Sequence, residues 1–119
     1  MSRLKFDLAQ EGLHCVLKPW QAEVMRFFWK LGIPLGSRAV YDHLQTVDVK
    51  GAKSRASVIN FLDFMVGEGF LDFVEESCKG GFRRVYSLNE RSETETRFRY
   101  SVYQMFASKL MKFRVEAEG

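Results

Sequence analysis

Hydrophobic residues recur at helical spacing in a first stretch of the chain, residues 19–31. Pro19 suits the first turn of a helix, because a backbone N–H at that position would have no partner within the helix and its absence costs no hydrogen bond. Gly32, followed by Pro34, suits the C-terminal end. The spacing therefore predicts a helix whose apolar stripe consists of Trp20, Val24, Phe27, Phe28 and Leu31.

Two further stretches have the same spacing and a serine at their start. Ser37 is the expected N-cap of a short helix over residues 37–47, and Ser54 is the expected N-cap of the next helix. The apolar positions of the first are Val40, Tyr41 and Leu44. The apolar face of the second is made of Val58, Phe61, Leu62, Met65 and Val66. Its opposite face carries Ala56, Ser57, Asn60, Asp63 and Gly67, and Gly69 is free to take the left-handed turn that ends it.

The spacing changes to two after Gly69. Residues 70–77 and 82–88 alternate around "CKGG", which predicts a β-hairpin with Gly80 and Gly81 in its turn. A long helix is predicted after the hairpin, with Ser92 and Glu95 as a capping box. Its stripe contains Phe98, Val102, Met105, Phe106, Leu110 and Phe113.

Three helices followed by a hairpin have the connectivity of a winged helix-turn-helix, so the expected fold is mostly α with a small β-hairpin. We expect residues 18–90 to form the winged domain and residues 91–119 a C-terminal dimerisation helix and tail. Residues 1–17 alternate loosely, which predicts either a small hairpin or an extended arm on the core.

The net charge of +3 and isoelectric point near 9.0 are weak indications of a nucleic-acid partner. The position of the charges is more informative. Lys50, Lys53 and Arg55 surround the start of the third predicted helix, where they can neutralise phosphates. Ser57 and Asn60 lie one turn apart on its polar face, and an asparagine amide matches the edge of adenine. The remaining expected DNA contacts are Lys79, Arg83 and Arg84 on the hairpin and Ser37 and Arg38 at the start of the second helix.

Other classes of protein fit the composition less well. Hydrophobic residues make up 46% and charged residues 28% of the 119 residues, an ordinary globular balance. We expect a cytoplasmic protein, because no apolar run is long enough to span a bilayer and the N-terminus does not resemble a secretory signal. Cys15 and Cys78 form no metal-binding pair, and His14 and His43 have no nearby nucleophile or carboxylate cluster. The expectation is therefore no enzyme, no metal and no cofactor.

From about Leu17 to Leu88 the chain resembles the penicillinase-repressor family of winged-helix regulators. The matching stretches are "LKPWQAEVMRFFWKLG", "SRAVYDHLQ", "SRASVINFLDFMVGEGFL" and "GGFRRVYSL". The resemblance implies that Ser57 and Asn60 face DNA and that residues 92–113 dimerise. Some family members are inactivated by cleavage of an Asn-Phe bond in the dimerisation region. Here that dipeptide occurs only at Asn60-Phe61, so proteolytic induction is not supported.

The sequence thus predicts a homodimeric, sequence-specific regulator that binds double-stranded DNA, with repression as the expected outcome. Two alternatives stay open: a winged helix used for protein contact, and a non-specific chromatin protein. The apolar stripe of the last helix also has an alternative, which is packing against its own domain.

Overall fold

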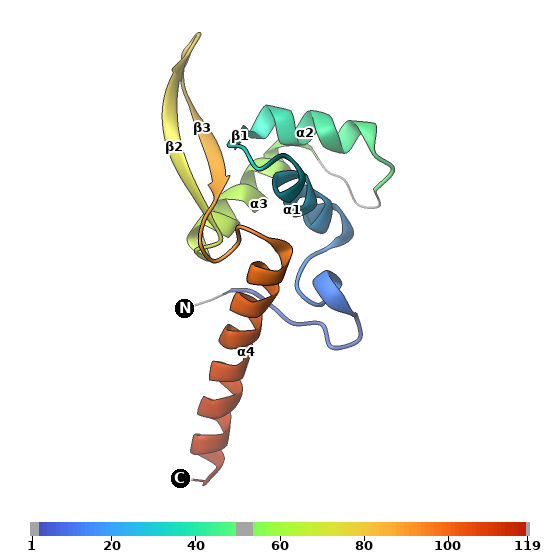
Figure 1. Cartoon of the computed structure of the whole chain (residues 1–119), viewed down its shortest axis with the longest axis vertical. Coiled ribbons are helices and arrows are strands. Elements are labelled where there is room, and N and C mark those ends of the chain that lie inside the picture. The colour runs from blue at the N-terminus through green and yellow to red at the C-terminus, as the bar shows by residue number, and fades with distance from the viewer. Residues whose placement is uncertain (1–2, 50–53, 119) are drawn as a thin grey trace.

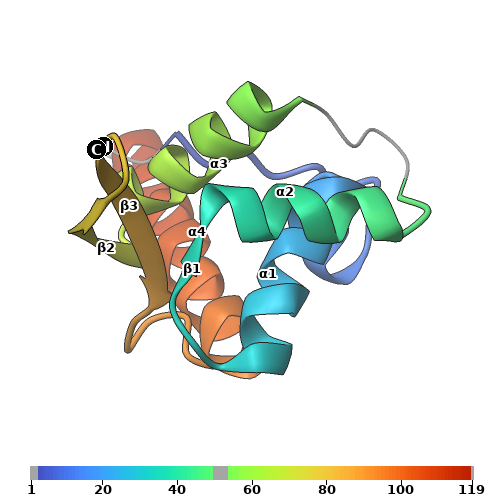
Figure 2. The same cartoon turned by 90° about the horizontal axis from the view of Figure 1, so that it is seen from above.

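The fold is a helical core with a β-hairpin rising from one end and a long helix leaving from the other (Figure 1). This computed structural model describes residues 3–49 and 54–118. The elements are η1 (Gly12–Cys15), α1 (Pro19–Leu31), β1 (Leu35–Gly36), α2 (Ser37–Thr46), α3 (Arg55–Gly67), β2 (Leu71–Cys78), β3 (Gly81–Leu88) and α4 (Glu95–Glu118). Seen from above, α2 and α3 lie side by side and α1 crosses beneath them (Figure 2). The predicted winged helix-turn-helix with a long C-terminal helix is confirmed.

The sheet has three antiparallel strands in the order β1-β3-β2. β2 and β3 form the predicted hairpin, in which Cys78 pairs with Gly81 across a two-residue turn. The sequence did not predict β1, whose Leu35 pairs with Tyr86 of β3. A two-residue strand is too short to show an alternating pattern. Its pairing joins the start of α2 to the base of the hairpin.

The core is shared by the three helices, the base of the hairpin and the first turns of α4. Phe70, which follows α3, meets Phe98 of α4 edge-on with ring centroids 4.8 Å apart. Trp20 of α1 meets Phe61 of α3 at 5.4 Å. Burying large aromatic rings is the main stabilising contribution in a domain of this size. These contacts fix α3 against α1 and fix the base of α4 against both.

Two of the three predicted serine caps are wrong. Ser54 caps α3 as expected, since its Oγ accepts a hydrogen bond from the Ser57 backbone N–H at 3.3 Å. Ser37, however, is the first residue of α2, and its N-cap is Gly36. Ser92 lies before α4 with its side chain buried, where its hydroxyl donates to the Phe70 carbonyl oxygen. Thr94 accepts the capping bond at the start of α4 instead.

The N-terminal segment is an arm rather than a hairpin, because residues 3–18 contain η1 and no strand. Leu4, Leu13 and Leu17 are buried in the core, and the Phe6 ring lies 4.2 Å from that of Phe106 on α4. The arm therefore covers one side of the first half of α4.

Candidate nucleic-acid interface

α3 is held by its apolar face, so its polar face is open to solvent. Val58 and Met65 are completely buried, whereas Ala56 and Asn60 on the other side of the helix are exposed. The Asn60 amide makes no hydrogen bond to any described residue, which leaves its donor and acceptor available. Ser57 is half-buried, and its Oγ lies 3.4 Å from the Oγ of Ser54 in the cap. Of the two predicted base-reading residues, Asn60 is the more accessible.

A groove runs between α3, the start of α2 and the inner strand of the hairpin. Its volume is about 400 Å³. We call it the wing groove, and its lining is Gly36, Ser37, Arg38, Arg55, Ile59, Asp63, Phe82, Arg83, Arg84 and Tyr86. The side chains of four arginines and one aspartate meet there, so the groove has a marked excess of positive charge.

Asp63 joins α3 to the hairpin. Its Oδ1 accepts hydrogen bonds from Arg84 Nη1 at 3.1 Å and from the Tyr86 hydroxyl at 2.6 Å. Burial, and then the bond to Asp63, raises the pKa of Tyr86 to about 12, and the same carboxylate raises the pKa of Arg84. The Arg84 guanidinium also lies over the Phe73 ring, 4.4 Å from its centroid. The negative charge of Asp63 on the polar side of α3 is thereby offset by its neighbours.

The hairpin is less basic than the sequence indicated. Lys79, Arg83 and Arg84 are balanced by three acids on β2, namely Asp72, Glu75 and Glu76. The register places Arg83 opposite Glu76, and the two form an ion pair at 2.6 Å. The charges are nevertheless sorted by strand. The arginines belong to β3, the inner strand that borders the groove, and the acids to β2 at the outer edge of the sheet.

The other predicted DNA contacts differ in position. Arg55 is exposed at the start of α3 and forms no ion pair with a described residue. Arg38 lines the groove and pairs with Asp42 one turn along α2, at 3.4 Å. Lys79 is exposed in the hairpin turn. Lys50 and Lys53 lie outside the described residues.

The six predicted dimerisation residues fall into two groups. Phe98 and Val102 are buried in the core of their own chain, and Met105 and Phe106 are half-buried. Leu110 and Phe113 are 52% and 71% exposed. The first half of the stripe therefore packs against its own domain, as the alternative reading held, and only the second half faces solvent.

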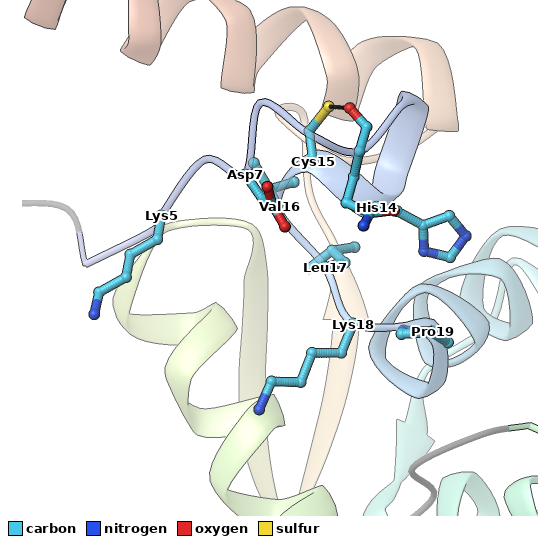
Figure 3. Close-up of a pocket in the computed structure, with 9 residues that line it drawn as sticks. Lys5, Asp7, His14, Cys15, Val16, Leu17, Lys18 and Pro19 are labelled. Atoms are coloured by element: carbon cyan, nitrogen blue, oxygen red, sulfur yellow. Dashed lines mark hydrogen bonds between the residues drawn. The ribbon is translucent and has the colours of Figure 1, made fainter.

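A second hollow, of about 470 Å³, lies between the arm and the start of α1 (Figure 3). Lys5, Asp7, His14 and Lys18 surround it. The half-buried Cys15 thiol donates a hydrogen bond to the Gln10 carbonyl oxygen at its edge, and the close-up draws this bond as a dashed line. Within residues 3–49 and 54–118 no cluster of His, Cys, Asp and Glu side chains is arranged to hold a metal ion. The same residues include no helix of the length and hydropathy that crossing a membrane requires.

Five residues of the wing groove were not among the predicted DNA contacts: Gly36, Ile59, Asp63, Phe82 and Tyr86. The alternation of side chains along the strand could have identified two of them. Residues two apart on a strand face the same side, so Phe82 and Tyr86 share a face with Arg84 once the hairpin turn is placed.

Several solved structures have a fold similar to that of this chain. No family model and no curated protein matches the chain. One similar solved structure, from Methanosarcina mazei, is described as a possible transcriptional regulator; it is 16% identical, with a TM-score of 0.59, over 87% of this chain and 81% of that one. A candidate transcriptional regulator from Thermoplasma acidophilum is 16% identical, with a TM-score of 0.51, over 82% and 92%. A protein of unknown function described as a potential transcription factor is 14% identical, with a TM-score of 0.51, over 82% of each chain.

Proposed function

We propose that this protein is a transcriptional regulator that binds double-stranded DNA in a sequence-specific manner as a homodimer, and that it acts as a repressor. In this proposal α3 enters the major groove and the hairpin lies along the phosphate backbone. The observation that carries the proposal is the wing groove, where four arginines lie beside the exposed face of α3. The regulatory descriptions of the three similar structures agree with it.

The exposed face of α3 has the chemistry needed to approach base edges. Ala56 is small, so it allows close contact, and Asn60 offers a free amide donor and acceptor. Arg55 stands at the N-terminus of the helix, where the helix dipole also favours a phosphate. Phosphate contacts of this kind would fix the position of the protein along the duplex, and a contact between Asn60 and a base edge would distinguish one sequence from another.

The ion pairs in and around the groove do not oppose DNA binding. The Arg38–Asp42, Arg83–Glu76 and Arg84–Asp63 pairs are all solvent-exposed. Exposed pairs contribute little to stability, since both partners remain well hydrated. An arginine can therefore exchange its carboxylate for a phosphate, or contact both, at small cost.

α4 leaves the wing groove accessible. The molecule extends 58 Å along its longest axis, with the hairpin at one end and the C-terminal half of α4 at the other (Figure 1). A helix with Leu110, Met111 and Phe113 exposed on its C-terminal half offers an apolar surface to a second copy. Pairing there would leave both α3 helices free to contact two half-sites.

The proposal is tested by the salt dependence of DNA binding. Fluorescence anisotropy with labelled duplexes, repeated over a range of salt concentrations, should give a linear fall of log K with log salt. Competition between random duplexes and the protein's own promoter region then measures specificity. Equal affinity for both would leave a non-specific chromatin protein, and absent binding at low salt would refute DNA binding altogether.

Protein contact through the hairpin is the alternative that one observation favours. The basic and acidic residues of the hairpin are equal in number, and Val74 on its outer strand is 64% exposed. A hairpin used this way would leave the salt dependence of DNA binding to cations outside the hairpin, such as Arg38 and Arg55. Retention of full DNA affinity after Arg83→Ala and Arg84→Ala together would support that alternative.

A further inference from the structure

Phe82 occupies a position that phosphate contact does not explain. It is the second residue of β3, next to the hairpin turn, and 75% of its surface is exposed. No described aromatic ring packs against it. A large apolar ring that protrudes from a hairpin is available for contact with a partner.

The register of the hairpin fixes the direction in which Phe82 points. Phe82 pairs with Ser77, Arg84 with Glu75 and Tyr86 with Phe73, and all six side chains lie on one face of the ribbon. The Tyr86 hydroxyl reaches Asp63 of α3 from this face. Phe82 is thus on the side of the hairpin that faces the recognition helix, but farther from the domain than Arg84.

The groove that the ring lines contains four arginines and one aspartate, whereas Glu75 and Glu76 belong to the outer strand. Lys79 lies in the turn, Arg83 follows Phe82 directly, and Arg38 and Arg55 line the same groove from the helical side. The combination of a protruding ring and flanking cations matches a nucleic-acid duplex, in which phosphates border a groove floored by stacked bases.

We infer that Phe82 is a wedge that enters the minor groove of bound duplex DNA, inserts between two base pairs and kinks the duplex. The inference rests on the proposed function. It adds that the bound DNA is bent, and that specificity depends in part on how easily the DNA sequence deforms. With α3 in the major groove, a hairpin that projects beyond the helices reaches the adjacent minor groove. Apolar side chains inserted there unstack a base step and bend the duplex by about 20–90°. Flexible pyrimidine–purine steps such as TA and CA are the easiest to open.

The inference is tested by measuring bending and binding separately. The probe is a set of duplexes of about 30 base pairs, selected by the wild-type protein from a random library and labelled with a fluorophore at each end. Wild type should raise the energy transfer between the ends, and 2-aminopurine placed at the kinked step should brighten as it unstacks. Phe82→Ala should abolish both signals and weaken binding about five- to 150-fold, the range expected when one aromatic stacking contact is removed.

Two control variants keep the result interpretable. Phe82→Leu retains an apolar wedge and should keep most of the bend. Val74→Ala removes a similarly exposed apolar side chain from the other face of the ribbon and should change neither signal. Both positions are exposed, so all variants should remain folded, which circular dichroism would check.

The outcomes separate this inference from the proposed function. Tight, salt-dependent binding without a bend, or a bend that Phe82→Ala leaves intact, overturns the wedge and leaves the DNA-binding proposal standing. An effect of Phe82→Ala on single-stranded DNA alone also overturns it, in favour of simple base stacking. Absence of any duplex binding by wild type overturns both.

Discussion

Asp63→Asn is expected to change stability and DNA affinity in opposite directions. Asp63 accepts hydrogen bonds from Tyr86 and Arg84, so the substitution weakens the connection between α3 and the hairpin. It also removes the single negative charge in the lining of the wing groove. A purely structural residue would affect stability alone, and the gain in affinity is what identifies the path of the DNA.

The stability loss comes mainly from the bond to Tyr86, which is 2% exposed. Bonds to a charged acceptor contribute about 1.5–3 kcal/mol, and the amide oxygen of the variant still accepts a neutral one. A net loss of about 1 kcal/mol follows, or a Tm lower by roughly 4 °C. Because the Arg84–Asp63 ion pair is exposed, its loss contributes little to the change in the free energy of unfolding.

Tyr86 provides an independent readout of the same change. Since its pKa is raised in the folded state, it contributes stability that is present below pH 10 and is lost as the pH rises through about 12. Burial is the largest cause of the raised pKa and is unchanged in the variant. Alkaline absorbance titration should therefore show the pKa of Tyr86 lowered in Asp63→Asn, yet still above its ordinary value.

The affinity gain follows from Coulomb's law. Unit charges about 4 Å apart in water interact with about 1 kcal/mol, which corresponds to roughly fivefold in Kd at low salt. Glu90→Gln is the matched control, since it removes one negative charge from an exposed position outside the groove lining. Anisotropy on random duplexes measures both variants. If folded Asp63→Asn binds no more tightly than Glu90→Gln, DNA does not run along the wing groove.

Three more predictions test the separate parts of the proposal. Arg55→Ala should weaken binding to every duplex and reduce the slope of log K against log salt by about one, whereas Arg26→Ala on α1 should do neither. Asn60→Ala should lose about 1–3 kcal/mol of discrimination at one base pair, measured on a panel of single-substitution sites; an equal loss on all sites would contradict base reading. Phe113→Asp should shift sedimentation from dimer toward monomer while Tyr100→Asp, on another face of α4, does not; identical behaviour of the two variants would remove α4 as the interface.

The helices and the hairpin could be predicted because each is long enough to show its period. Residues 54–66 have four buried side chains on one face, and Ser54 caps the N-terminus of the helix through a bond to the nearby Ser57 N–H. β1 could not be predicted, since two residues have no period. The Ser92 capping box failed for a tertiary reason, because that hydroxyl bonds to Phe70 from a distant part of the chain.

The site was predictable in composition but not in arrangement. Arg55 and Arg84, which the sequence predicted as DNA contacts, both line the wing groove. The partner of Arg84 was not predicted, because Arg84 and Asp63 are far apart in sequence. The α4 stripe shows the same limit, since periodicity places Phe98 and Phe113 on related faces but cannot tell which of them meets the chain's own core.

Amide chemical shifts during a titration with duplex DNA would show whether α3 and the hairpin are the elements that contact DNA. Perturbations should concentrate in residues 54–64 of α3 and residues 79–86 of the hairpin, with smaller changes at the start of α2. Residues 108–114 of α4 should keep their shifts. Perturbations centred on α4 or on the outer strand β2, with α3 unchanged, would refute DNA binding through α3.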